Sequence, residues 1–334
     1  MPALAVADAL RAEGAQVVFI GGERAEATLV PEAGYELHAI RVEGLSRTNP
    51  LKAARGALRA GGAVGSSLRL LRSLRPHAVL GGGGYVAGTV GAAAVMRRVP
   101  LVLSEADSHL GISNRALARF ARRVCLAFPI AGRASDLYLV TGRPVPPPAS
   151  DRDAARRRFG LADDDTVVLV FGGSLGARSI NVAAVEAFAE APFRVLHAAG
   201  ARDVSSLTAP GPHYDIRPYI SEFGEALLAA DLVVARSGGS VFEIAAAGRP
   251  AILIPYPHAA ADHQTANAQW MERAGAAVIV PDGELGATRL AREVDALLGD
   301  RAKLAEMAAA SAALARPDAA REIAGELLRA ARGD

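Results

Sequence analysis

Short apolar runs alternate along the chain with longer segments in which apolar residues recur about every 3.6 positions. Runs this short and rich in Val, Ile and Leu are typical of buried parallel strands, and strands separated by helices indicate βαβ units. The longer segments, such as Ala116–Arg123 and Ser221–Ala230, are predicted helices. The predicted strands are Val17–Ile20, Ala78–Leu80, Leu101–Leu103, Val167–Phe171, Arg194–His197, Leu232–Ala235, Ala251–Pro255 and Ala277–Val280.

A proline-rich stretch, Thr141–Ser150, interrupts this alternation. Its four prolines cannot continue a helix or a central strand, so we predict a linker at 141–150 between two α/β halves with a cleft between them. The halves are expected at residues 1–140 and 151–316. The segment 317–334 begins with proline and Asp318 and has the pattern of a final amphipathic helix.

The first predicted element is a helix, in residues 2–15 (PALAVADALRAEGA). A doubly wound domain normally begins with a central strand and its glycine turn. Either the fold is unusual, or translation starts upstream of Met1 and the first strand and glycine loop are encoded there. Sequencing the upstream region for an in-frame strand and glycine loop separates these expectations.

Composition excludes several classes of protein. The chain has 334 residues, 51% hydrophobic and 22% charged, with a net charge of +2, which argues for about two globular domains and against disorder or a nucleic-acid binder. Lys52 and Lys303 are the only lysines and neither lies in a Walker motif, while the single cysteine, Cys125, excludes an intrachain disulfide. The uncharged run at 78–96 is better explained as a strand, a glycine turn and a helix than as a membrane span.

Two glycine clusters, at residues 81–88 and 172–178, each follow a predicted strand and precede a predicted helix. Glycine lets the backbone approach a ligand closely, and the N–H groups at a helix start attract anions. The clusters could be simple tight turns, a dinucleotide fingerprint with Glu105 as its acid, or diphosphate cradles for a sugar nucleotide. The second cluster also matches the nucleophile elbow G-x-S-x-G at Ser174, with His263 later in the chain as its partner.

The C-terminal half favours the sugar-nucleotide interpretation. Glu243 falls in the first turns of a helix that starts at a glycine-serine turn, where a carboxylate can accept hydrogen bonds from a ribose diol. Gln264 and Asn267 lie three apart on one helix face, where amides could contact sugar hydroxyls. The alternatives are a helix N-terminal charge for Glu243 and ordinary surface polarity for His263 and Gln264.

Five motifs together carry a resemblance to a known family: GGGGYVAG (81–88), SNRALA (113–118), GGSLGARSIN (172–181), EIAAAG (243–248) and DHQTANA (262–268). Over essentially its whole length the chain resembles the MurG family, the UDP-N-acetylglucosamine–N-acetylmuramyl-(pentapeptide) pyrophosphoryl-undecaprenol N-acetylglucosamine transferases. The resemblance implies a GT-B fold, two Rossmann-like α/β domains with parallel sheets facing a central cleft. It assigns acceptor and membrane binding to the N-terminal domain, UDP-sugar binding to 151–316, and a terminal helix that packs back on the N-terminal domain.

The resemblance also implies an inverting transferase of peptidoglycan synthesis that joins N-acetylglucosamine from UDP to the 4-hydroxyl of a lipid-linked muramyl-pentapeptide. Glu243 would bind the ribose, Ile220 the uracil through its backbone, and Gln264 the hydroxyls of the sugar. The implied donor-binding residues are Ser174, Ile220, Gly238, Gly239, Ser240, Glu243, Gln264, Asp107 and Arg143. The implied acceptor-binding residues are Gly83, Gly84, Tyr85 and Asn114.

The chain departs from the family pattern at several of these places. The first glycine loop of the family, with a histidine near the chemistry, is expected just before Pro2. Asp107 replaces a donor-contacting asparagine, and Arg143 stands near the position of a donor-binding arginine that is not in place. Residues 236–243 are one residue shorter than the family pattern. These differences concern binding details more than the class of reaction.

The implied reaction needs a base for the acceptor hydroxyl and stabilisation of the leaving diphosphate. Glu105, at the end of a predicted strand, is the best candidate base, and glycine-turn N–H groups would stabilise the diphosphate. We expect no cofactor and no metal, because Asp163–Asp165 is better explained as a solvated turn.

A membrane-anchored acceptor implies a peripheral enzyme on the cytoplasmic face of the cell membrane. Residues 44–104 hold nine basic and no acidic residues, and leucine and arginine alternate at helical spacing in Leu68–Arg75. That helix could lie on an anionic surface, or its leucines could belong to the core.

Three other functions stay open at this stage. The chain could be another GT-B sugar-nucleotide transferase that acts on a lipid or small acceptor. It could be a serine hydrolase using Ser174, or a non-catalytic remnant.

Overall fold

The computed structural model describes residues 2–23, 25–40, 50–173, 175–259 and 262–333, and for 50–61 only the course of the helix. The chain forms two compact units, Met1–Val145 with Asp318–Asp334, and Pro146–Pro317. The division falls inside the proline-rich stretch, where residues 141–151 form neither helix nor strand.

The C-terminal unit is built on one parallel sheet of six strands in the order β9-β8-β7-β10-β11-β12. This is the doubly wound order 3-2-1-4-5-6, which reverses between β7 and β10. The strands are β7 (Val167–Phe171), β8 (Arg194–Ala198), β9 (Tyr214–Arg217), β10 (Leu232–Ala235), β11 (Ala251–Leu253) and β12 (Ala277–Ile279). The helices are α6 (Arg152–Arg158), α7 (Arg178–Ala187), α8 (Phe223–Ala229), α9 (Val241–Ala246), α10 (His263–Arg273), α11 (Ala287–Leu298) and α12 (Arg301–Ala313).

The core of this unit is the sheet itself. Every residue of β7 and β10 is buried, as expected for parallel strands covered on both faces. On one face Val168, Val170 and Val234 pack with Ile180 of α7 and Leu290 of α11. The carboxyl ends of β7 and β10 are thereby held rigidly side by side, at the place where open α/β sheets bind ligands.

The N-terminal unit contains two parallel sheets, β1-β2 and β3-β4-β5-β6. Helix α4 contacts both β1 and β3, and Ile20 of β1 packs on the core that contains Leu101 and Val124 of the larger sheet. The strands are β1 (Val18–Gly21), β2 (Glu36–Ala39), β3 (Val79–Gly81), β4 (Leu101–Glu105), β5 (Arg123–Leu126) and β6 (Tyr138–Val140). The helices are α1 (Pro2–Ala12), α2 (Glu26–Glu32), α3 (Pro50–Leu74), α4 (Gly84–Met96), α5 (Ile112–Leu117) and the distant α13 (Ala319–Arg332).

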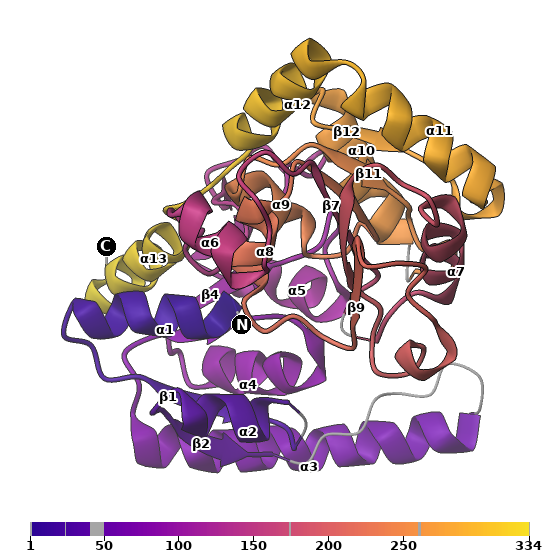
Figure 1. Cartoon of the computed structure of the whole chain (residues 1–334). Helices are drawn as coiled ribbons and strands as arrows, with labels where there is room; N and C mark the ends of the chain where they lie inside the picture. Colours follow the sequence, from indigo (N-terminus) through magenta and orange to yellow (C-terminus); the bar gives the residue numbers. More distant parts are fainter. Residues whose placement is uncertain (1, 24, 41–49, 174, 260–261, 334) are drawn as a thin grey trace. The chain divides into compact units, whose positions relative to one another are not determined.

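Helix α13 joins the N-terminal unit although it is the last helix of the chain. Figure 1 shows it beside α1, and it also contacts β4. Ile323 of α13 packs with Val6 and Leu10 of α1 in one apolar cluster. Glu326, which is 6% exposed, accepts a hydrogen bond of 3.0 Å from Nε of Arg123 in β5.

Most predicted elements are confirmed, with shifts of up to three residues at their ends. The predicted helix Ala116–Arg123 is wrong in its second half: α5 ends at Leu117, a 3₁₀ turn spans Ala118–Phe120, and Arg123 begins β5. Tertiary pairing with β4 and β6 decides this segment, because Val124–Leu126 are almost completely buried. Strands β2, β5, β6 and β9 were not among the predicted strands.

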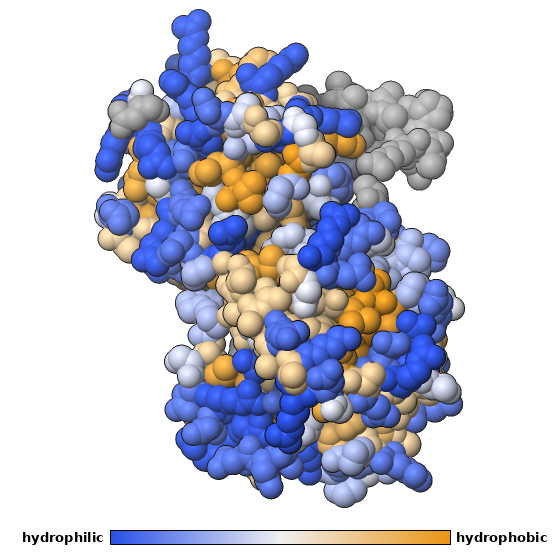
Figure 2. Space-filling view, turned by 90° about the horizontal axis from the view of Figure 1, so that it is seen from above, coloured by the Kyte–Doolittle hydropathy of each residue, from blue (hydrophilic) through white to orange (hydrophobic). Residues whose placement is uncertain are grey.

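The uncharged run at 78–96 is β3, a glycine turn and α4, as predicted. Among the helices of the described residues, none has both the length and the apolar character that a bilayer crossing needs. On the face shown in Figure 2, hydrophilic residues cover much of the surface and hydrophobic residues gather in separate areas.

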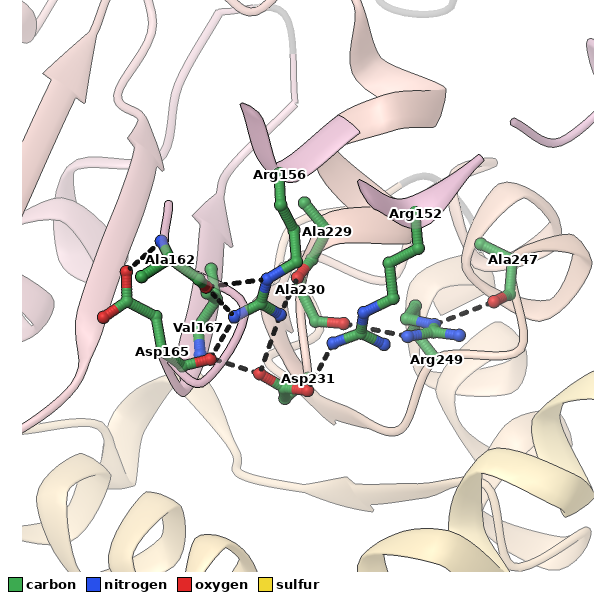
Figure 3. Close-up of polar contacts among 10 residues, drawn as sticks. All are labelled: Arg152, Arg156, Ala162, Asp165, Val167, Ala229, Ala230, Asp231, Ala247 and Arg249. Carbon is green, nitrogen blue, oxygen red and sulfur yellow. Dashed lines mark hydrogen bonds and ion pairs between the residues drawn. The ribbon is translucent and has the colours of Figure 1, made fainter. Parts of the chain in front are cut away.

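A partly buried ionic network lies in the C-terminal unit at the amino ends of β7 and β10 (Figure 3). Asp231, just before β10, forms an ion pair of 2.6 Å with Arg152 of α6 and accepts a hydrogen bond of 2.8 Å from the amide of Val167. Arg156 is 3% exposed and donates to the carbonyls of Ala162, Asp165 and Ala229. Helix α6 is thus anchored at the sheet edge opposite the glycine turn.

Candidate functional site

The turn after β7 brings the backbone unusually close to itself. Gly173 and Gly176 have φ of +92° and +79°, a region that other residues rarely adopt. A Cβ on Gly172 would lie 2.3 Å from the amide nitrogen of Ala177. The turn leads directly into α7, so backbone N–H groups gather at the carboxyl end of β7, the layout of an anion site. Ser174, predicted to contact the donor, lies outside the described residues.

A second turn, residues 236–240, lies at the carboxyl end of the neighbouring β10. Gly238, Gly239 and Ser240 are half-buried and lead into α9. The hydroxyl of Ser237 donates to the carbonyl of Gln264 at 2.8 Å, and Asn267 Nδ2 donates to the carbonyl of Ser237 at 3.0 Å. The start of α10 is therefore fixed against this turn, and Gln264 lies next to Gly238–Ser240.

Arg236, directly after β10, binds the segments that follow β11 and β12 and the start of α7. Its guanidinium donates to the hydroxyl of Ser179 in α7 at 2.8 Å and to the carbonyls of Ile254 and Pro255 after β11 at 3.2 Å each. It also pairs with Asp282 after β12 at 2.6 Å. Since Arg236 is 8% exposed and so fully engaged, it shapes the site rather than offering a charge to a ligand.

The other predicted donor residues of this unit lie on the same sheet edge. Glu243 is half-buried on α9, one turn after Ser240, and Ile220 is a buried residue in the loop between β9 and α8. Gln264 is half-buried, and its Oε1 accepts the amide hydrogen of Tyr256 at 3.0 Å. Asn267 is 2% exposed, and its Oδ1 is buried without a hydrogen-bond partner among the described residues.

In the N-terminal unit, the structure joins the predicted acceptor residues to Glu105. Gly83 and Gly84 have φ of +83° and +78° in the turn after β3. Ser113 donates to the carbonyl of Gly84 at 2.8 Å, and a Cβ on Gly83 would lie 3.6 Å from Nδ2 of the buried Asn114. Asn114 Nδ2 in turn donates to Oε2 of Glu105 at 3.0 Å. Tyr85, in the first turn of α4, is 49% exposed beside this group.

Glu105 is 6% exposed and engaged through both carboxylate oxygens. Oε1 accepts the amide hydrogen of Asp107 at 3.2 Å, and Oε2 accepts that of Gly111 at 2.8 Å as well as the amide of Asn114. The carboxylate therefore holds the loop 105–111 and the start of α5. The orphan Oδ1 of Asn114, buried and without a partner among the described residues, lies in the same group.

Asp107 and Arg143, also predicted to bind the donor, belong to the N-terminal unit, whereas the remaining described donor residues belong to the C-terminal unit. Both side chains are half-buried. Within each unit the predicted residues are close to one another along one sheet edge.

In the parts of the chain that the structure describes, no group of three or more His, Cys, Asp or Glu side chains could hold a metal ion. The acidic run Asp163–Asp165 is a turn before β7, in which Asp165 Oδ2 accepts the amide hydrogen of Ala162 at 2.8 Å.

Sequence reasoning missed the buried polar residues that support the site. Neither the bonds from Arg236 to Ser179 and Asp282 nor a second network through His197 and Asn181 was predicted. The available signal was positional: Arg236 and Asp282 each directly follow a predicted strand or nearly so, at the ligand-binding edge.

Comparisons with known proteins agree with this geometry. Residues 1–126 match the model of the glycosyltransferase family 28 N-terminal domain, and residues 167–323 match that of the family 28 C-terminal domain. The UDP-N-acetylglucosamine–N-acetylmuramyl-(pentapeptide) pyrophosphoryl-undecaprenol N-acetylglucosamine transferase of Rubrobacter xylanophilus is 42% identical, with 98% of this chain and 99% of that protein covered.

Two solved structures are similar over nearly the whole chain. The crystal structure of Acinetobacter baumannii MurG has a TM-score of 0.78 at 30% identity and covers 98% of this chain and 95% of its own. The calicheamicin glycosyltransferase CalG4 has a TM-score of 0.71 at 17% identity, over 98% and 95% of the two chains, and shows the fold alone. The predicted fold class, two Rossmann-like domains of the GT-B type, is confirmed.

Proposed function

Because the chain belongs to glycosyltransferase family 28, we propose that it transfers N-acetylglucosamine from UDP-N-acetylglucosamine to the 4-hydroxyl of undecaprenyl-pyrophosphoryl-N-acetylmuramoyl-pentapeptide. The observation that carries the proposal is its full-length similarity to transferases of that name. The alternatives raised by the sequence, a hydrolase built on Ser174 or a transferase for another acceptor, are not favoured by these relatives.

In this proposal the C-terminal unit binds the donor. The glycine turn 172–177 and the start of α7 offer backbone N–H groups to the diphosphate, in the place of a cation. Glu243 accepts hydrogen bonds from the ribose diol, Ile220 contacts the uracil through its backbone, and Gln264 binds the sugar hydroxyls. Asp107 and Arg143, which belong to the N-terminal unit, are also proposed to bind the donor.

The acceptor is proposed to bind at Gly83, Gly84, Tyr85 and Asn114, with Glu105 taking the proton of the attacking hydroxyl. The hydroxyl oxygen then forms its bond to the anomeric carbon from the face opposite UDP, and UDP leaves with the bonding pair. Oε1 of Glu105 accepts only one described hydrogen bond, so it has a lone pair for this proton. Glu105→Gln is expected to lower kcat about a hundredfold or more with unchanged donor affinity.

The donor proposal is tested by titrating UDP-N-acetylglucosamine, with UDP-glucose as the control ligand. Glu243→Ala is expected to weaken binding about thirtyfold, the effect of losing about 2 kcal/mol of hydrogen bonding to a charged group. Glu272→Ala, at an exposed residue of α10, serves as the matched control and should bind normally. A folded wild-type chain that does not bind UDP-N-acetylglucosamine contradicts the proposed function.

We further propose that the enzyme contacts anionic lipid through one edge of the N-terminal unit. In the part of helix α3 whose side chains are described, Leu71 is 1% exposed and Leu68 and Leu70 pack on the core, so these three leucines are not free to enter a membrane. Exposed basic residues gather instead at the amino ends of β3, β4 and β5, together with Met96 and Phe120, which are 65% and 49% exposed. This basic edge comprises Arg75, Arg97, Arg98, Arg119 and Arg122.

Two loops of the basic edge meet in one shallow hollow lined by Arg98, Phe120 and Arg122. β4 has five residues, so the basic edge lies about 17 Å from the acceptor loop at about 3.3 Å per residue. An amphipathic pairing of arginines with exposed apolar side chains suits the headgroup region of a membrane.

Sedimentation with phosphatidylglycerol-containing vesicles tests this contact, with pure phosphatidylcholine vesicles for comparison. Reversing both charges in Arg98→Glu with Arg122→Glu is expected to reduce binding at least about tenfold, because each basic residue near the surface contributes about 1 kcal/mol. Arg301→Glu, an exposed position of α12, should leave binding unchanged. Binding that is insensitive to salt, or equal for both variants, would refute this surface.

A further inference from the structure

A row of buried hydrogen bonds runs beneath the glycine turn of the C-terminal unit. It starts at Tyr214 in β9, passes through His197 in β8 and reaches Asn181 in α7. His197 is 0% exposed, with its Nδ1 3.0 Å from the hydroxyl of Tyr214 and its Nε2 3.0 Å from Oδ1 of Asn181. None of these atoms can touch a ligand, because Asn181 and Tyr214 are 0% and 3% exposed.

The direction of each hydrogen bond follows from Asn181. Its Nδ2 donates to the carbonyl of Ala199 at 2.8 Å and to Oδ2 of Asp203 at 3.0 Å, so its Oδ1 must be the atom that faces His197. An amide oxygen only accepts, so Nε2 of His197 carries the hydrogen and Nδ1 accepts from Tyr214. Burial lowers the pKa of His197 to about 4, which keeps the ring neutral and this order of donors fixed near neutral pH.

The row ends on the loop 199–203, which touches the glycine turn. A Cβ on Gly176 would lie 2.1 Å from the carbonyl oxygen of Ala199, and one on Gly200 would lie 2.4 Å from the amide nitrogen of Gly176. Arg202 Nε donates to the carbonyl of Leu175 at 3.2 Å. The backbone of the loop 199–203 is therefore in direct contact with the backbone of the glycine turn at Gly176. Any movement of the loop must displace the turn.

We propose that Tyr214, His197 and Asn181 are positioning residues that set Leu175 and Gly176 of the glycine turn for the donor's diphosphate by fixing the loop 199–203. The inference rests on the proposed function only in taking UDP as the ligand of that turn. It adds three residues, from three different elements, that act on diphosphate binding without touching it.

The test compares UDP with uridine, which lacks the diphosphate, by titration into the full chain. His197→Leu removes both hydrogen bonds and is expected to lower the ratio of UDP to uridine affinity about tenfold. His197→Gln places an amide N–H near the position of Nε2, keeps the donor to Asn181, and should restore most of that ratio. A purely structural role would lower both affinities together or neither.

Val195→Ala is the matched control, since Val195 is a 1%-exposed residue of the same strand outside the row. It should lose stability and keep the affinity ratio. If His197→Leu does not fold, Gly200→Ala displaces Gly176 directly and should lower the same ratio. A wild-type chain that fails to bind UDP defeats the proposed function, whereas normal UDP binding with an unchanged ratio in folded His197→Leu or Gly200→Ala overturns this inference alone.

Discussion

Single buried polar residues decide the shape of the donor edge. Three of them donate side-chain hydrogen bonds to backbone carbonyls of neighbouring loops: Arg236, Asn181 and Asn267. A buried donor that loses such a partner costs about 1–3 kcal/mol, so each loop has one favoured position. The site is therefore held by residues that a ligand never meets.

The neutral state of His197 makes stability depend on pH. Its folded pKa of about 4 lies below the ordinary 6.5, so the unfolded chain takes up a proton first as the pH falls. Stability is full above pH 6.5 and declines toward pH 4, with about 2 kcal/mol lost by about pH 5. Urea unfolding at pH 7 and pH 5 should show a smaller decline in His197→Gln, and an identical decline in both chains would contradict the assignment.

The sequence predicted which residues lie at the ligand-binding edge better than it predicted the hydrogen bonds that those residues make. Glu243 was predicted from its place after a glycine-serine turn and Gln264 from its place near a helix start, and both lie at the carboxyl edge of the sheet. The engagement of Glu105 by three N–H groups could not be predicted, because its partners Gly111 and Asn114 arrive through the local path of the loop 105–111. The reason is physical: periodicity reports which face is buried, not which hydrogen bond is made.

Among the elements of the C-terminal unit, the two edges of the sheet have different roles. The amino edge carries the ionic network, and the carboxyl edge carries the candidate ligand site. Helix α6 is joined to β7 and β10 by Arg152, Arg156 and Asp231, on the side away from the glycine turn. Arg249, whose pKa is lowered by burial and by nearby Arg152, adds bonds to the carbonyls of Ala230 and Ala247. This edge serves stability.

Arg156→Leu should therefore lower the free energy of unfolding and leave the affinity for UDP nearly unchanged. The change leaves the carbonyls of Ala162, Asp165 and Ala229 without their donor and is expected to cost about 3 kcal/mol of unfolding free energy. Affinity for UDP should stay within about twofold of the wild type. Arg157→Leu, an exposed neighbour on the same helix, is the control for both measurements. Equal stability of the two variants would mean that the network contributes nothing.

The strands most clearly predicted were those buried on both faces, such as β7 and β10, whose apolar runs are continuous. β9 was missed because it is an edge strand with Asp215 and Arg217 in it, and β5 because a helical period in 116–123 ran across its start. A local sequence pattern does not show which strand lies at a sheet edge or which strands pair. These two strands could therefore be recognised only in the folded structure.

At the scale of the whole molecule, the chain enters the C-terminal unit at Pro146 and leaves it at Pro317. The final helix then completes the apolar cluster of α1 and β4. Hydrogen bonds from Arg329 and Arg123 outweigh burial and hold the pKa of Glu326 below its ordinary range, so the carboxylate is charged where it meets β5.

Ile323→Ala should therefore weaken the N-terminal unit. Ile323 is 1% exposed, and truncating a buried isoleucine typically costs about 2–5 kcal/mol. Hydrogen exchange is expected to accelerate in α1 and β4 and to stay unchanged in β7 and β10. Arg321→Ala, at a side chain that is 78% exposed, should change neither set of amides. Faster exchange in β7 and β10 alone would contradict the packing of α13.

Helix α13 follows the C-terminal unit in the chain but belongs to the N-terminal unit. A protease that cuts the chain near Pro317 would leave α13 packed against α1, so the cut protein would migrate as one particle until it is denatured. A fluorophore on α13 reports on the unit that contains α1, and a second one on α12, a few residues earlier, reports on the other unit. Two labels that are near neighbours in sequence would thus report on two different units.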